Sequence, residues 1–288
     1  MLKKPQLITI GIAILLTAAI YLFGRTVPEK RIAKAEVHGP DDGHNHAVTS
    51  SFSIDSVLNM AKKNLDSDVQ VRLESLEHSV SRRDVKDQQL HIYHQLARFW
   101  GDSARVFEPY SWYLAQAARL ENSEKSLTFA ARLFLENLQS DSDPMRRQWK
   151  ALQAKDLFER SLIINPANDS ARVGLGACYL FGNISTAPME GIGEIRKVVD
   201  KDSTNIYAQM MLAKGSLVSG QYDKAISRLL TVTRINPSNS EAMLLLADLY
   251  ERTGKKDSAI VWYRKSLEFF DREEVKKAIR ERVEMLEK

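Results

Sequence analysis

The chain has 288 residues, of which 27% are charged and 44% hydrophobic, and these values are ordinary for a folded protein. Its net charge of +4 comes from interleaved bases and acids, which argues against a nucleic-acid-binding protein. The one cysteine, Cys178, excludes an internal disulfide, and its apolar neighbours favour a small core residue. The sequence has no phosphate-binding glycine loop and no nucleophile elbow, so we expect neither an enzyme nor a cofactor.

The N-terminal segment predicts a single-pass membrane anchor. Residues 1–4 form a short basic tail, and residues 5–24 carry no charge and are rich in Ile, Leu and Ala. Such a run is about as long as a helix that crosses a hydrocarbon core of ~30 Å. A cleaved signal peptide is the alternative, but its apolar core is usually shorter, and no small-residue cleavage motif follows this run directly.

The orientation of this span stays open at the sequence level. Four basic residues follow it, namely Arg25, Lys30, Arg31 and Lys34. Counted alone, these bases place the C-terminal side of the span in the cytoplasm. A long domain, however, can be translocated whatever the charge beside the span. We favour translocation, and keep the cytoplasmic side as the alternative.

Residues 25–52 predict a disordered linker, because prolines, glycines and polar residues occur there without an apolar period. His38, His44 and His46 lie in it beside two aspartates, a set that could gather a divalent metal such as zinc or copper. We favour a hydrophilic tether and assign no metal site. Residues 53–85 then show two apolar stripes at helical spacing, which predict an N-terminal helical cap.

Two stretches near the C-terminus repeat each other at an offset of 34 residues. Six residues of the first stretch recur in the second: Ala208, Leu212, Ala213, Gly220, Ala225 and Ile226 return as Ala242, Leu246, Ala247, Gly254, Ala259 and Ile260. A fixed period of this length predicts stacked units that bury their apolar faces against each other. We expect the alanines where two helices approach closely, and the glycines just past helix ends.

These residues resemble the tetratricopeptide repeat, which has a 34-residue unit of two helices. The last unit supplies Met243, Leu246, Ala247, Tyr250, Ala259 and Tyr263 to the family's pattern. The resemblance covers residues 86–270, is clearest over 169–270, and has Gly191 where an alanine is expected. It implies an all-α solenoid with a right-handed superhelical twist. Residues 271–288 carry one apolar face and predict a C-terminal capping helix.

The resemblance also implies a concave groove, lined by the first helix of each pair. The candidate partner-binding residues are Val173, Ala177, Leu180, Tyr207, Met210, Lys214, Leu217, Leu244, Asp248 and Glu251. Several of them are apolar at positions where one subset of the family clamps a partner's carboxylate, so we expect that clamp to be absent or incomplete. An apolar floor favours an apolar or amphipathic protein segment as partner. Core packing between units is the alternative for these side chains.

His91 and His94 share a helix face, but no carboxylate stands at ligand spacing, so we expect a structural role. The sequence as a whole predicts a membrane-anchored scaffold or assembly factor that binds other proteins. The layout resembles bacterial repeat proteins whose repeats lie outside the inner membrane, which favours a periplasmic domain. Two alternatives remain: an apoprotein-presenting subunit of the cytochrome-maturation type, and a metal-handling protein that uses the histidine linker.

Overall fold

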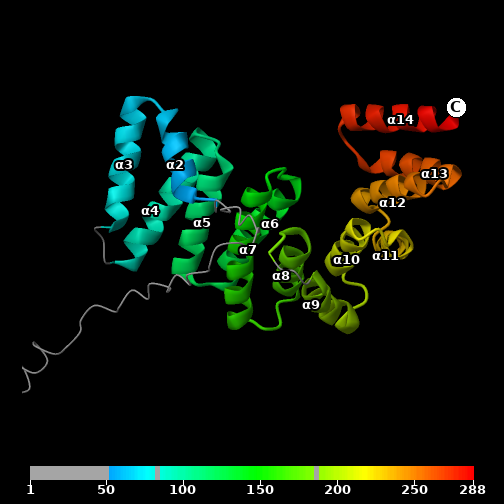
Figure 1. Cartoon of the computed structure of the whole chain (residues 1–288), viewed down its shortest axis with the longest axis horizontal. Coiled ribbons are helices and arrows are strands. Elements are labelled where there is room, and N and C mark those ends of the chain that lie inside the picture. Colours follow the sequence, from blue (N-terminus) through cyan, green and yellow to red (C-terminus); the bar gives the residue numbers. More distant parts are fainter. Residues whose placement is uncertain (1–51, 82–84, 185–187) are drawn as a thin grey trace, which may run out of the picture. The chain divides into compact units, whose positions relative to one another are not determined.

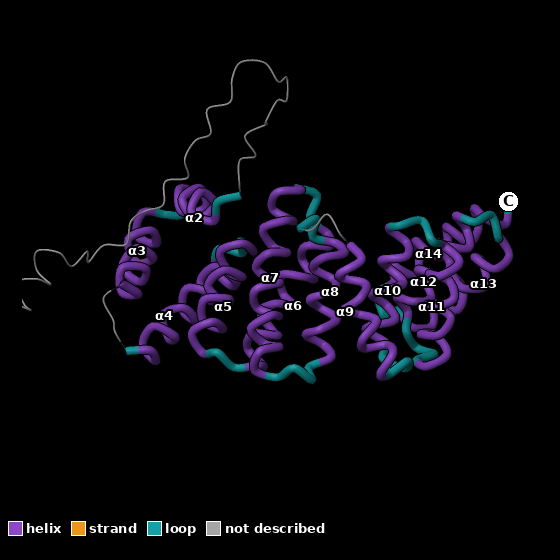
Figure 2. The backbone as a smooth tube through the Cα atoms, turned by 60° about the horizontal axis from the view of Figure 1, so that its bottom comes forward, coloured by secondary structure: helices purple, strands orange, loops and turns teal. Residues whose placement is uncertain are grey.

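The structure is a computed structural model that describes residues 52–81, 85–184 and 188–288. The predicted tail, the predicted span, and His38, His44 and His46 lie outside these residues. Every regular element in the described ranges is a helix (Figure 2), which confirms the all-α prediction for this part of the chain. None of the helices in those ranges combines the length and the apolar character needed to cross a membrane.

The helices follow one another in antiparallel pairs, each packed most extensively on its neighbour in sequence (Figure 1). Before the pairs come α2 (Ile54–Lys63) and α3 (Ser67–Ser81). The first helices of the pairs are α4 (Lys86–Arg98), α6 (Glu124–Ser140), α8 (Asp169–Phe181), α10 (Ile206–Val218) and α12 (Ser240–Arg252). The second helices are α5 (Phe107–Glu121), α7 (Pro144–Ile164), α9 (Pro188–Lys201), α11 (Tyr222–Ile235) and α13 (Lys256–Ser266). The short η1 (Phe99–Ser103) and η2 (Leu267–Phe269) follow α4 and α13, and α14 (Glu273–Glu287) ends the chain.

Three of the first helices begin in the same way. The side chains of Asn168, Asn205 and Asn239 each accept a hydrogen bond from a backbone N–H in the first turn of α8, α10 and α12. An N-cap of this kind stabilises a helix by about 1 kcal/mol. Two pairs also turn alike, since Gly220 and Gly254 have φ of +70° and +74° just past the ends of α10 and α12. The glycines therefore stand where the sequence predicted them.

The core of the pairs uses small residues at the predicted positions. Ala213, Ala225, Ala247 and Ala259 have no exposed surface, and neither does Cys178. One pair departs from the family pattern. A Cβ atom placed on Gly191 of α9 would lie 2.4 Å from the carbonyl oxygen of Gly176 in α8. The alanine that the pattern expects would therefore clash, because these two helices approach more closely than an alanine permits.

Short helical segments cover the two ends of the described pairs. At the first pair, α3 packs on α4 and α2 packs on α5, and Leu58 and Leu73 are buried in one cluster with Leu96 and Trp100. At the last pair, Ile279 and Val283 of α14 are buried with Ala247, Ala259 and Tyr263. Both segments thus shield apolar side chains of the terminal pairs from water.

Candidate partner-binding groove

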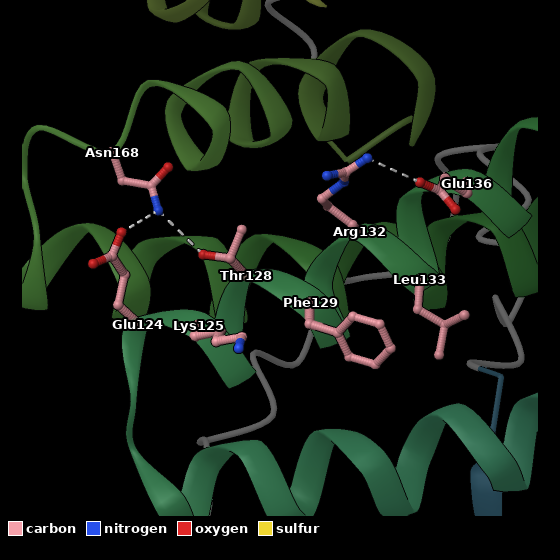
Figure 3. A pocket seen from close by; sticks show the side chains of 8 residues that line it. All are labelled: Glu124, Lys125, Thr128, Phe129, Arg132, Leu133, Glu136 and Asn168. Carbon is pink, nitrogen blue, oxygen red and sulfur yellow. Dashed lines mark hydrogen bonds and ion pairs between the residues drawn. The ribbon is translucent and has the colours of Figure 1, made fainter.

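Two adjoining cavities follow the first helices of the pairs. The first has a volume of about 610 Å³ and is lined by residues of α6 and by Asn168 (Figure 3): Glu124, Lys125, Thr128, Phe129, Arg132, Leu133 and Glu136. The second, of about 570 Å³, is lined by Arg132, Leu135, Glu136, Gln139, Ile206, Tyr207, Met210, Met211, Lys214, Asn239 and Glu241. Arg132 and Glu136 line both cavities, so the two lie side by side along α6, and we call them together the α6–α10 groove.

A polar network fixes the beginning of this groove. The side-chain amide of Asn168 donates to Glu124 Oε1 at 2.6 Å and to Thr128 Oγ1 at 3.3 Å, as Figure 3 shows. Asn165 Nδ2 donates to the same Glu124 oxygen at 3.0 Å. One oxygen of this carboxylate thus accepts two hydrogen bonds from the loop that precedes α8. These bonds hold the start of α6 against α8, and they leave the neighbouring residues of α6 to face the cavity.

The next part of the groove is apolar. Phe129 is 60% exposed although it is aromatic, and Leu133 lies one helical turn farther along α6. Both side chains extend from the same side of α6 (Figure 3). The opposite side of α6 is apolar as well, and its Leu127, Ala130, Ala131 and Phe134 are buried in the core. Helix α6 therefore carries a second apolar face, and an exposed patch of this kind often marks a binding site.

Paired charges occupy the middle of the groove. The guanidinium of Arg132 lies 3.5 Å from Glu136 Oε1 and 5.9 Å from the centroid of the Tyr207 ring. This contact joins α6 to α10. Burial raises the pKa of Tyr207 to about 12, so the hydroxyl is neutral at physiological pH. The groove therefore offers a cation, a carboxylate and a neutral hydroxyl to a partner.

The far end of the groove joins three helices. Lys214 Nζ of α10 lies 2.7 Å from Glu241 Oε1 of α12 and 3.4 Å from Gln139 Oε1 of α6. The ammonium group is partly exposed, since its side chain retains 22% of its accessible surface. Acidic and basic groups thus alternate along the groove, which suits a partner that carries both signs of charge beside its apolar residues.

The structure brings several of the predicted groove residues to cavities. Tyr207, Met210 and Lys214 line the α6–α10 groove. Leu217 and Asp248 line a smaller cavity of about 250 Å³ between α10 and α12. The other predicted positions lie outside these cavities. Leu180 and Leu244 are half-buried against the core, and Glu251 accepts hydrogen bonds from Tyr263 and Arg282.

Three of the predicted groove residues are not open to a partner. Val173 and Ala177 of α8 have no exposed surface, and Met210 is 4% exposed, which favours for these three the alternative of core packing between units. All three belong to the main hydrophobic core of the repeat pairs. On the same side, Arg132 of α6 contacts the ring of Tyr207 of α10, and Lys214 of α10 donates to Gln139 of α6, so side chains of α6 and α10 meet directly.

The sequence prediction missed the α6 side of the groove. Lys125, Phe129, Arg132 and Glu136 lie before Asn165, where the repeat pattern is degenerate. The sequence nevertheless contains a signal for this apolar patch. Phe129 and Leu133 are four residues apart on the helix face opposite the buried Phe134, and two apolar residues at that spacing predict an exposed patch.

Nothing in the described ranges points to catalysis. No group of His, Cys, Asp and Glu residues within them could hold a metal ion. His91 and His94 are exposed on α4, and His91 Nε2 forms a hydrogen bond with Gln95 at 3.0 Å. Burial raises the pKa of the Cys178 thiol far above its usual range, so this cysteine is not a nucleophile.

Comparison with known proteins supports the type of repeat. Residues 210–273 match the tetratricopeptide repeat family model. A tetratricopeptide repeat protein from Parabacteroides merdae is similar in structure, with a TM-score of 0.52 and 15% identity, over 81% of this chain and 86% of that chain. This likeness shows the fold alone. The pairs α4/α5 to α12/α13 therefore have a tetratricopeptide-type arrangement, and residues 210–273 also carry the family's sequence pattern.

Two other solved structures are similar at a lower level. The tetratricopeptide repeat protein TTC0263 from Thermus thermophilus has a TM-score of 0.49 and 15% identity, over 70% of this chain and 98% of that chain. MamA from Desulfovibrio magneticus RS-1 has a TM-score of 0.43 and 19% identity, over 62% of this chain and 94% of that chain. No curated protein matches the chain significantly.

Proposed function

We propose that this protein is a non-enzymatic scaffold that holds a segment of a partner protein in the α6–α10 groove. The observation that carries the proposal is the exposed ring of Phe129, at 60% exposure, inside a cavity of about 610 Å³. An aromatic side chain that is left in water costs free energy, and a bound apolar side chain would relieve that cost. Aromatic residues of this kind are enriched among the anchors of protein interfaces.

The charges of the groove define the partner further. A segment that places an apolar side chain against Phe129 and Leu133 would carry its flanking residues past Arg132 and Glu136. Both charges lie near the surface in an existing ion pair, so they can rearrange toward a partner at small cost. An amphipathic helix or an extended segment with an apolar stripe and mixed charges fits these requirements.

We also propose that residues 5–24 anchor the scaffold in a membrane through the linker 25–52, with the helical domain on the periplasmic side, where it serves the assembly of other proteins. The support is the uncharged apolar run of suitable length. The full-length protein should stay with membranes after a carbonate wash at high pH. A soluble protein whose N-terminus begins beyond residue 24 would contradict the anchor.

The groove is tested by crosslinking in intact membranes, followed by mass spectrometry of the captured partners. Phe129→Glu should lower the yield of the specific partner at least ~10-fold, because a central aromatic anchor is worth ~2 kcal/mol or more. Helical content should stay at the wild-type level, since the side chain is exposed. The matched control is Ile163→Glu, an equally drastic change at a position of α7 that is 80% exposed and lines none of the cavities described above.

Two results would contradict the groove proposal. One is a Phe129→Glu protein that captures the same partners at the wild-type yield. The other is an equal loss for Ile163→Glu, which would assign the effect to surface charge in general. Arg132→Glu provides a second, independent variant at the point that both cavities share.

A further inference from the structure

A separate pocket lies among the helices that precede and form the first pair. It has a volume of about 490 Å³, and α2, α3, α4 and α5 all contribute to its walls. The residues that matter here are Asp55, Lys62, Glu77, Tyr93, Trp112 and Tyr113. None of them lines the α6–α10 groove. The volume is within the usual range of ~300–1,000 Å³ for small-molecule sites.

Three aromatic rings line this pocket beside Leu58. The rings of Tyr93 and Tyr113 have centroids 6.4 Å apart and planes tilted by 32°. Trp112 is the third ring, and the guanidinium of Arg119 lies 5.8 Å from its centroid. Among the described residues no cation lies over the ring of Tyr93 or Tyr113. Ring faces attract cations, and this attraction strengthens where water is excluded.

The charges of the pocket leave it negative. Glu77 accepts a hydrogen bond from the Tyr113 hydroxyl at 2.8 Å, and its other oxygen pairs with Lys62. Lys62 therefore neutralises Glu77. Asp55 is exposed and forms no ion pair within the described part of the chain. Burial, followed by the charge of Glu77, raises the pKa of Tyr113 well above its usual range, so its hydroxyl adds no charge.

We infer that this pocket binds an organic ammonium group, which Asp55 attracts and the aromatic rings of the pocket walls contact. An alkylated ammonium suits the walls because its methyl or methylene groups contact the rings while its charge faces the carboxylate. A carboxylate ligand would be repelled by Asp55, and a neutral apolar ligand would gain nothing from that charge. The group can come from a free amine or from a lysine side chain of a protein.

The test compares choline with its uncharged isostere 3,3-dimethylbutan-1-ol, titrated into the full chain by calorimetry. Choline should bind, and the isostere should bind at least ~10-fold more weakly. Only choline carries the positive charge that the aromatic rings and the Asp55 carboxylate attract. Asp55→Asn and Tyr93→Leu should each weaken choline binding ~3-fold or more. The control is Asp68→Asn, which removes an exposed carboxylate of α3 outside the pocket and should leave the affinity unchanged.

A gain of affinity gives the sharpest check. Lys62→Met removes the internal cation that pairs with Glu77, so a second carboxylate becomes available and choline should bind ~3-fold or more tightly. Nα-acetyl-lysine methylamide, tested beside choline, distinguishes a protein side chain from a free amine. The inference is overturned by any of three results: neither ammonium compound binds, the isostere binds as tightly as choline, or Asp55→Asn leaves the affinity for choline unchanged. Each of these results leaves the α6–α10 groove proposal untouched, because the two sites share no lining residue.

Discussion

Lys150 Nζ lies 2.5 Å from Asp141 Oδ2, and both side chains are almost fully buried, at 2% and 3% exposure. The same ammonium lies 2.9 Å from Glu108 Oε1 of α5 and donates to Asn137 Oδ1 of α6 at 2.5 Å. Arg146 also pairs with Asp141, at 2.6 Å. Asp141 lies in the turn between α6 and α7. The network therefore links α5, α6 and α7 at the turn within the second pair.

Removal of Asp141 should destabilise the protein strongly. Asp141→Ala leaves the buried ammonium of Lys150 with one carboxylate, and breaking a buried pair in this way costs about 3 kcal/mol or more. The free energy of unfolding in urea measures the loss. The control is Glu281→Ala, which breaks a surface pair with Lys277 at 3.9 Å and should change stability by less than about 0.5 kcal/mol. A loss below about 1 kcal/mol for Asp141→Ala would show that the network is dispensable.

The same carboxylate predicts a pH dependence. Hydrogen bonds from Arg146, and then from Lys150, hold the pKa of Asp141 well below its ordinary value of 3.8. Since the folded pKa is the lower one, the stability from Asp141 is complete above about pH 4 and is lost as the pH falls toward the folded pKa. Urea unfolding of the wild type and of Asp141→Ala should therefore differ most near pH 7 and converge in acid. A gap that stays constant below about pH 4 would contradict this assignment.

Gly191 should not tolerate the alanine of the family pattern. Gly191→Ala places a methyl group 2.4 Å from the Gly176 oxygen, so α8 and α9 must separate. We expect a net loss of stability, because overpacking costs about 1–3 kcal/mol and alanine recovers only about 1 kcal/mol through helix propensity. Gly193→Ala on the same helix is the control, since a Cβ there meets nothing within 4 Å and should stabilise the protein. Equal melting temperatures for the two variants would refute the close approach of α8 and α9.

The cap function of α14 can be tested with two residues of the same helix. Ile279 is 6% exposed against the last pair, whereas Met285 is 56% exposed. Ile279→Ala should cost about 2 kcal/mol or more in unfolding free energy, and Met285→Ala should cost less than about 0.5 kcal/mol. Removal of residues 271–288 should lower stability further and promote aggregation. Unchanged melting of the truncated protein would argue against the cap.

The sequence predicted the later pairs well because their pattern is strong and local. Helices α10 to α13 repeat the same residues at the same interval, so Gly220, Gly254, Ala225 and Ala259 could be placed before the structure was known. The earlier pairs depart from this pattern. Counted from the N-cap, Ala130 of α6 stands where α12 has Leu246, so the first helix of the second pair lacks this large residue of the family's pattern.

The exposure of the groove residues was harder to predict than the fold, because it depends on contacts between helices that are distant in sequence. Helical register places Val173 and Ala177 on the inner face of α8, but it says nothing of which neighbouring helices bury them. Arg132 and Tyr207 are 75 residues apart, and only the packing of three successive pairs brings them together.

Helix α14 has a consequence for any attempt to lengthen the protein. It packs on the last pair, with Ile279 and Val283 buried and Arg282 donating to Glu251. Repeat arrays grow when a new pair stacks on the exposed side of the terminal one. Here that side is already occupied. Extra repeats fused after Lys288 would therefore meet a charged helix, and a longer array could be built only by inserting pairs before α14, with α14 moved to the new end.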